Sequence, residues 1–222
     1  MGYQEEFIEF MVRSKVLTFG DFVTKSGRRT PYFINTGNYK TGEQIAKLGD
    51  FYADCVIGKA GRDFDLLYGP AYKGIPLAVA AAISLYRKYG MNIPFCFNRK
   101  EKKDHGEGGE MIGAAPQNEQ RVVIIEDVVT AGTSVRESVT LLRQAAAVNI
   151  TGLVVSVDRM ERGSGSQTTL QELEEVFGIR TYAIVTIADI LKYLYGREID
   201  GRVLIDAATK TRIEDYLRIY GA

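Results

Sequence analysis

Short apolar runs alternate with segments of helical periodicity over most of the chain. The runs lie at about 65–68, 94–97, 122–125, 152–157 and 181–187. Between them apolar side chains recur at helical spacing, as in Val135, Val139 and Leu142. Continuous apolar runs are typical of strands buried on both faces of a parallel sheet. The pattern therefore predicts an α/β domain with a mostly parallel central sheet flanked by helices, including helices at about 73–89 and 170–177 and two short C-terminal ones.

The N-terminal part of the chain has a different pattern. Apolar residues at helical spacing in roughly the first fourteen residues predict an amphipathic helix. Segment 17–37, LTFGDFVTKSGRRTPYFINTG, alternates aromatic and β-branched residues with polar ones around a Ser-Gly turn, which indicates a short antiparallel unit. Thr41 and Gln44 have the spacing of a capping box for the helix that follows, expected to end near residue 58. We expect one domain over 1–222, to which residues 1–40 contribute a small lobe.

Charge and composition exclude several classes of protein. Lysine plus arginine and aspartate plus glutamate both number 28, so the formal net charge is zero and no overall basic field favours nucleic acid or anionic membranes. The chain has one histidine, His105, and two separated cysteines, Cys55 and Cys96, which do not make a zinc cluster. A Ser-His-Asp hydrolase would have to be built on that one imidazole, which argues against this class. No leader pattern or long apolar span is visible, so we expect a cytoplasmic protein with no membrane contact.

The strongest candidate for a binding site follows the apolar run 122–125. Two carboxylates, Glu126 and Asp127, come directly after this run, and the small polar turn Thr130–Ser134 then opens a helix. The start of a helix offers unpaired N–H groups to an anion, and ligands of parallel sheets bind beyond the carboxyl ends of the strands. No GxxxxGK string is present, which argues against a nucleoside triphosphatase. Acids beside an anion cradle suit a sugar phosphate, whereas the alternative is a capped helix beside solvated acids.

Two further strand exits carry cations. Lys73 lies in the turn GPAYKG, where it is able to meet a phosphate as a point charge. Segment 98–110, NRKEKKDHGEGGE, is dense in charge and rich in glycine, so we expect a mobile loop that closes over a polyphosphate. The alternative for both segments is a solvated surface loop.

The string IIEDVVTAGTS resembles the phosphoribosyl pyrophosphate motif of the type I phosphoribosyltransferases. The segments KSGRRTPYFINTG, LLYGPAYKGIPLA, FNRKEKKDHGEGG and SVDRMERG, in this order and spacing, are similar to those of the orotate phosphoribosyltransferases of the short microbial type. The resemblance covers nearly the whole chain. It implies the type I phosphoribosyltransferase fold, in which the small N-terminal lobe forms a hood.

The resemblance also implies a reaction. Members of the family transfer the ribose 5-phosphate unit of phosphoribosyl pyrophosphate to N1 of orotate, giving orotidine 5'-monophosphate and pyrophosphate in pyrimidine (UMP) biosynthesis. They use Mg²⁺, and we expect the metal to be held mainly by substrate and water near Glu126 and Asp127, without a direct protein ligand. They form homodimers in which the charged loop reaches the partner's site.

By resemblance, donor-binding residues are Lys25, Tyr72, Lys73, Arg99, Lys100, Lys103, His105, Glu126, Asp127, Val128, Val129, Thr130, Ala131, Gly132, Thr133 and Ser134. Catalytic roles fall to Lys103, Lys73, Lys100, Asp127 and His105. Of these we expect Lys103 to stabilise the transition state most. Glu126 stands where many members have aspartate, a change of reach rather than of chemistry.

The acceptor residues implied by the resemblance are Phe33, Ile34, Thr130 and Arg159. Many members have a second aromatic residue at the position of Ile34, so base stacking or pocket shape is expected to differ here. An arginine offers a planar fork to a carboxylate, which suits orotate. The alternative for Arg159 is a structural pair with Asp158 or Glu161.

Three other functions remain open from the sequence. The donor motif alone does not exclude transfer to a purine or to uracil, although the acceptor segments argue against it. A regulator that senses the donor would have no use for a catalytic loop. A purely structural domain would leave three chemically suited strand exits as coincidences.

Overall fold

A central sheet organises the molecule, for which a computed structural model describes residues 2–24, 27–101, 110–163 and 165–222. Within these residues the sheet runs in the order β5 (Met111–Gly113), β4 (Phe95–Asn98), β3 (Leu66–Tyr68), β6 (Arg121–Ile125), β7 (Asn149–Asp158) and β8 (Arg180–Thr186). Neighbouring strands are parallel except at the β4–β5 edge. The predicted mostly parallel sheet is therefore confirmed.

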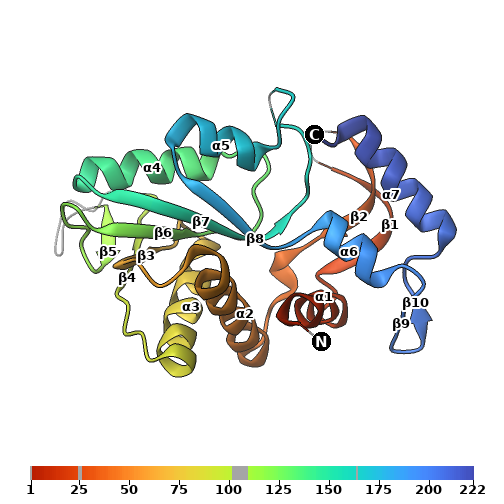
Figure 1. Ribbon diagram of the computed structural model, residues 1–222, viewed down its shortest axis with the longest axis horizontal. Helices are drawn as coiled ribbons and strands as arrows, with labels where there is room; N and C mark the ends of the chain where they lie inside the picture. Colours follow the sequence, from red (N-terminus) through yellow and green to blue (C-terminus); the bar gives the residue numbers. More distant parts are fainter. Residues whose placement is uncertain (1, 25–26, 102–109, 164) are drawn as a thin grey trace.

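Helices cover both faces of this sheet, α2 (Gly42–Cys55) and α3 (Gly74–Tyr89) on one face and α4 (Thr133–Ala145) and α5 (Thr169–Phe177) on the other (Figure 1). Side chains alternate between the two faces of a strand. In β6, Val123 and Ile125 join the core beneath α2 and α3, whereas Val122 and Ile124 join the core beneath α4 and α5. Two buried faces explain why this strand is continuously apolar.

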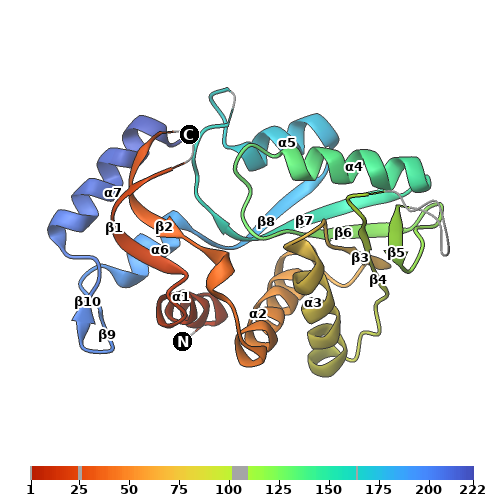
Figure 2. The same cartoon turned by 180° about the vertical axis from the view of Figure 1, so that it is seen from behind.

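The N-terminal segment lies beside the sheet. Helix α1 (Tyr3–Arg13) precedes the antiparallel hairpin of β1 (Leu17–Val23) and β2 (Arg29–Ile34), and a short 3₁₀ turn, η1 (Thr36–Asn38), leads back to α2. The C-terminal helix α7 (Ala207–Tyr220) packs against β2 and so joins this lobe from the far end of the chain (Figure 2). We call α1, β1, β2 and α7 together the hood.

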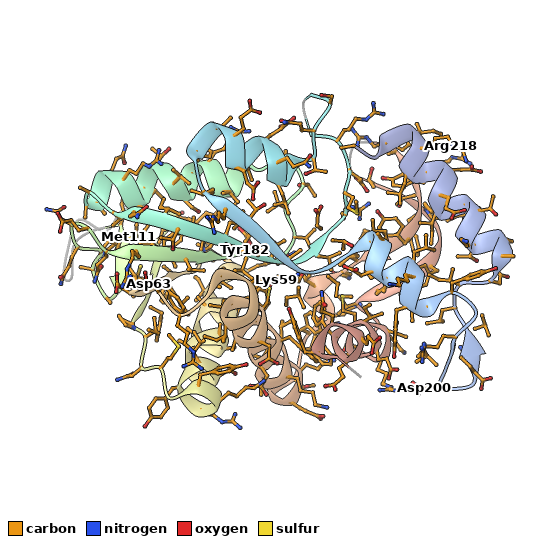
Figure 3. The ribbon with its side chains drawn as sticks, viewed as in Figure 1. Lys59, Asp63, Met111, Tyr182, Asp200 and Arg218 are labelled. Atoms are coloured by element: carbon orange, nitrogen blue, oxygen red, sulfur yellow. The ribbon has the colours of Figure 1, made fainter. Side chains whose placement is uncertain are left out.

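Several boundaries differ from the sequence prediction. The Thr41–Gln44 capping box is present, but α2 ends at Cys55 and a π-helical turn, η2 (Val56–Ala60), follows. In this turn the Lys59 Nζ donates to the Ala183 carbonyl of β8 at 2.6 Å, close to Tyr182 (Figure 3).

The prediction of two short C-terminal helices is wrong for the second. Helix α6 (Ile187–Leu194) is short, but α7 has 14 residues. Only Ile213 and Tyr216 of this helix are buried, so the pattern of apolar residues underestimates its length. Strands β5, β9 (Glu198–Ile199) and β10 (Arg202–Val203) are absent from the prediction because each has only two or three residues and, unlike β3, none is a continuous apolar run. Among the described residues, no helix is both long and apolar enough to cross a bilayer.

The close packing of α2 on α3 generates a stability prediction at Gly49. A Cβ added at Gly49 would lie 2.6 Å from the Ala80 carbonyl oxygen of α3, whereas one added at Gly42 would meet nothing within 4 Å. In an unpacked helix, alanine would be the better residue. We expect Gly49→Ala to lower the free energy of unfolding by about 2 kcal/mol, since the helices must separate.

Denaturant unfolding of Gly49→Ala, with Gly42→Ala as the matched control on the same helix, measures this effect. Equal free energies of unfolding for the two variants would show that the helices accommodate the extra methyl group.

Candidate active site

The exits of strands β3 and β6 converge on one open cavity of about 250 Å³. Its lining comes from loop 71–73 after β3 and from residues 126–135 at the end of β6 and the start of α4. The two exits meet because the sheet order places β3 and β6 side by side. A cavity between an acidic strand end, a lysine and a helix start has the components of a phosphate and sugar site.

Lys73 and Asp127 form an ion pair at the edge of this cavity. The Lys73 Nζ lies 2.8 Å from Asp127 Oδ2 and donates to Thr36 Oγ1 at 3.0 Å. The Thr36 hydroxyl in turn donates to the same Asp127 oxygen at 2.8 Å. The Lys73 side chain is 63% exposed and that of Asp127 13%, so the cation is accessible to a ligand while the carboxylate is held in place.

Glu126 is buried beneath the same cavity. Its Oε2 accepts a hydrogen bond from Ser134 Oγ at 2.7 Å, and its Oε1 accepts one from the Asp127 backbone N–H at 2.9 Å. Burial raises the pKa of Glu126 to about 7, although both hydrogen bonds oppose that shift. Near neutral pH this carboxyl group is therefore partly protonated. Its hydrogen bond to Ser134 connects the strand end with the start of α4.

The turn Thr130–Ser134 leads into α4. Gly132 precedes the helix with φ 73°, and a Cβ there would lie 3.3 Å from Thr169 and Leu173 of α5. The turn is fixed from α5 by the Thr169 hydroxyl, which donates to the Thr130 carbonyl at 2.7 Å. Among the described side chains none caps the start of α4. The first N–H groups of the helix are thus available to an anion.

The loop after β3 is fixed from the neighbouring strand. Asn98 Oδ1, at the end of β4, accepts hydrogen bonds from the Ala71 backbone N–H at 2.8 Å and from the Tyr68 hydroxyl at 3.0 Å. Tyr72 is 70% exposed, and the Lys100 Nζ lies 5.7 Å from the centre of its ring. Rigid anchoring at Asn98 holds the Lys73 turn against the cavity.

The remaining predicted cations lie apart or outside the described residues. Arg99 and Lys100 line a separate cavity of about 710 Å³, which meets the first at Ala71, Thr133 and Ser134. Lys25, Lys103 and His105 fall outside the described residues, as does most of the predicted loop.

The predicted acceptor residues lie in the hood and at the exit of β7. Phe33 is 37% exposed and stacks on Phe22 with ring centres 5.5 Å apart, whereas Ile34 packs against the core. Arg159 contacts Glu161 through Nε at 2.8 Å and Nη2 at 2.5 Å, and its guanidinium lies 4.7 Å from the centre of the Tyr32 ring. Of the two structural partners considered for Arg159, the structure has Glu161.

Two polar residues near these groups have contacts that the sequence does not predict: Thr36 altogether, and Glu161 beyond its pairing with Arg159. Thr36 accepts a hydrogen bond from Lys73 and donates one to Asp127, which lies 91 residues further along the chain. Glu161 binds both Arg159 and the hood. Thr36 lies inside the segment KSGRRTPYFINTG and Glu161 inside SVDRMERG. Their positions within those family-like segments could have marked both residues as functional, but their hydrogen-bond partners are brought near only by the tertiary fold.

Comparisons with known proteins agree on one family. The phosphoribosyl transferase domain matches residues 35–183. The chain is 56% identical over 219 residues to an orotate phosphoribosyltransferase of Clostridium acetobutylicum, covering 99% of this chain and 98% of that protein. It is 52% identical over 221 residues to the one of Clostridium beijerinckii, covering 100% and 99%. The crystal structure of orotate phosphoribosyltransferase from Francisella tularensis is similar with a TM-score of 0.84 and 36% identity, covering 98% of this chain and 100% of that chain.

The burial of Glu126 generates a prediction about stability and pH. The folded state binds more protons than the unfolded chain between the ordinary pKa of 4.5 and the folded pKa of about 7. The free energy of unfolding therefore falls as pH rises through this range. We expect Glu126→Gln to remove that fall, so that the variant gains on the order of 3 kcal/mol relative to the native chain between about pH 5 and pH 8.

Denaturant unfolding at both pH values measures the difference, with Glu175→Gln on the exposed side of α5 as a control for the same chemical change. Parallel pH dependence in the native chain and Glu126→Gln would contradict the raised pKa.

Proposed function

The chain belongs to the orotate phosphoribosyltransferases, and from this premise we propose that the cavity between β3, β6 and α4 is its active site. The enzyme transfers ribose 5-phosphate from phosphoribosyl pyrophosphate to N1 of orotate in pyrimidine biosynthesis. The observation that carries the assignment of the site is the buried acid pair Glu126–Asp127 directly beside an uncapped helix start. No other described strand exit combines carboxylates with an anion cradle.

The donor's three chemical parts have separate partners in this proposal. Residues Thr130–Ser134 bind the 5-phosphate through hydroxyl groups and N–H groups at the start of α4. Asp127 and Glu126 bind the ribose hydroxyls. Tyr72 and Lys73 bind the pyrophosphate, for which the Lys73 ammonium exchanges its Asp127 partner for a phosphate oxygen.

Magnesium fits beside this acid pair as a substrate-held ion. Mg²⁺ keeps several waters and binds through one or two carboxylates plus substrate phosphates. Asp127 offers a hard oxygen at the cavity, whereas both Glu126 oxygens already accept hydrogen bonds. We therefore propose that pyrophosphate, ribose and water oxygens hold the metal next to Asp127. When bound, it supplies positive charge to the leaving group.

Catalysis then consists of stabilising separated charge. Departure of pyrophosphate leaves positive charge on the sugar, and no covalent nucleophile is needed. Lys73, Lys100, Lys103, Arg99 and His105 are proposed to surround the leaving group with cationic donors. Closure of the 98–110 loop would exclude water, which would otherwise compete with the base.

Orotate is proposed to bind between the hood and this donor site. Arg159 would receive its carboxylate, and Phe33 and Ile34 would contact the base together with Thr130. Phe33 presents an exposed ring, and Arg159 lies against Tyr32 in the same hood strand. Both residues lie where β2 meets the exit of β7, which supports placing the acceptor at this junction, and Tyr32 and Phe33 face opposite sides of β2.

A homodimer with shared sites is also proposed. This proposal rests on the family, in which the loop of each subunit reaches the other's site. Arg99 and Lys100, at the start of that loop, line a cavity that adjoins the donor cavity at Ala71, Thr133 and Ser134. A cytoplasmic location is proposed as well, and the buried free thiols Cys55 and Cys96 are typical of reducing compartments.

The reaction is tested by measuring pyrophosphate release from phosphoribosyl pyrophosphate and Mg²⁺. Parallel reactions contain orotate, uracil, hypoxanthine or no base. We expect release with orotate alone, because only this base brings a carboxylate to Arg159.

Release with another base would keep the donor site but overturn the acceptor residues. Donor binding without release, whichever base is present, would favour a regulator that senses the donor.

The shared site is tested by mixing two inactive variants, Lys73→Ala and Lys103→Ala. In a hybrid dimer, the subunit carrying Lys103→Ala keeps its own Lys73 and receives Lys103 from its partner. Random exchange makes about half of the dimers hybrids with one intact site each, so we expect recovery of about a quarter of native activity. Alone, Lys103→Ala should lower turnover much more than donor affinity.

Lys47→Ala, on the exposed face of α2, is the matched control and should keep native activity. No recovery in the mixture after verified subunit exchange, or near-normal turnover of Lys103→Ala, would contradict the proposed role of the loop.

A further inference from the structure

One oxygen of Glu161 gathers hydrogen bonds from three parts of the fold. Glu161 Oε1 accepts from Arg159 Nε and Nη2 at the exit of β7. The same oxygen accepts from the Tyr32 hydroxyl of β2 at 3.2 Å and from the Tyr216 hydroxyl of α7 at 2.8 Å. The Arg28 Nη1 lies 3.9 Å from the other carboxylate oxygen. This carboxylate is thus the junction between the hood and Arg159.

The backbone around Glu161 is fixed independently of its side chain. Met160 has φ 54°, and its N–H donates to Asp158 Oδ1 at 2.7 Å, which defines the turn between Arg159 and Glu161. Glu161 pairs with Gly221 in an antiparallel bridge, and the Arg162 N–H donates to the Tyr220 carbonyl at 2.8 Å. Both ends of the Arg159–Glu161 pair therefore have defined positions.

The geometry leaves one side of the guanidinium for a ligand. Arg159 directs Nε and Nη2 at Glu161, and the Tyr32 ring covers one face of the group. Among the described residues no hydrogen bond from Nη1 is found, and the Tyr216 hydroxyl is the other polar group that contacts the guanidinium. The side chains of Arg159 and Glu161 are only 12% and 18% exposed, so the guanidinium has little freedom to turn.

We propose that Glu161 is the positioning residue that presents Arg159 to the carboxylate of orotate, and so sets the preference for orotate over uracil. This inference rests on the proposed role of Arg159. A buried arginine without its carboxylate would turn toward another acceptor or toward water, because an unpaired buried charge is costly. The tyrosine hydroxyls donate to Glu161 and offset part of its charge, which limits its repulsion of the incoming carboxylate.

The test is steady-state kinetics of Glu161→Gln, which keeps the shape of the side chain and removes its charge. We expect the KM for orotate to rise about tenfold or more, the scale of a hydrogen bond to a charged group, with the KM for the donor within about twofold. Uracil brings no carboxylate to Arg159, so pyrophosphate release with uracil should stay at its native level in Glu161→Gln. A merely structural loss would affect both substrates alike.

Two further variants keep the test decisive. Tyr216→Phe removes one hydrogen bond to Glu161 and should raise the orotate KM by about threefold, a result that is readable even if Glu161→Gln folds poorly. Glu214→Gln makes the same chemical change on the exposed face of α7 and should leave all constants at their native values.

Arg159→Ala separates failure of the inference from failure of the site. If Arg159→Ala leaves the orotate KM unchanged, the proposed role of Arg159 is wrong and the inference fails with it. If Arg159→Ala raises that KM but neither Glu161→Gln nor Tyr216→Phe does, only the positioning role is overturned. In the Arg159→Ala background, we expect Glu161→Gln to add no further rise, and an additive effect would overturn the proposal.

Discussion

The burial of two adjacent carboxylates at the end of β6 constrains the structure around the site. Neither Glu126 nor Asp127 has enough exposed surface to be stabilised by water alone, so each needs partners from the fold. Glu126 takes Ser134 of α4 and is partly protonated near neutral pH. Asp127 forms an ion pair with Lys73 of the loop after β3 and accepts a hydrogen bond from Thr36, which follows β2 of the hood. The partners of these two carboxylates thus bring together the loop that carries Lys73, the start of α4 and the turn that carries Thr36.

Two of the cations proposed to meet substrate anions, Lys73 and Arg159, are already paired with carboxylates, but in different ways. Lys73 is largely exposed and shares its acidic partner with Thr36, so a phosphate oxygen is able to replace Asp127 while the threonine hydroxyl still holds that carboxylate. Arg159 is largely buried, and one edge of its guanidinium is bound to Glu161. Its ligand must therefore add to the pair instead of replacing it. A single-point ammonium suits exchange between partners, whereas a planar guanidinium suits simultaneous contact with two.

The parts of this arrangement that the sequence predicts are those with local patterns. The continuous run in β6 predicts a doubly buried strand, and the acids and small polar residues after it mark its exit as a site. Thr36 and Glu161 could not be recognised as junctions because their partners lie up to 129 residues away. The length of α7 and its place in the hood follow from its packing on β2, although only two of its residues, Ile213 and Tyr216, are buried. The roles of Lys25, Lys103 and His105 stay predictions, since these residues lie outside the described ones.

The position of Ile34 changes the meaning of its departure from the family pattern. Successive side chains of a strand point to opposite faces, and in β2 the Phe33 ring is exposed while Ile34 packs against the core. Of the two residues proposed to contact the base, Phe33 is therefore the one with an exposed ring, and that ring stacks on Phe22. An isoleucine at position 34 therefore changes how β2 packs on the core and leaves the exposed Phe33 ring in place. Selectivity for the base is accordingly expected to reside in polar contacts, and Arg159, whose guanidinium lies 4.7 Å from the centre of the Tyr32 ring, is the cation proposed to make them.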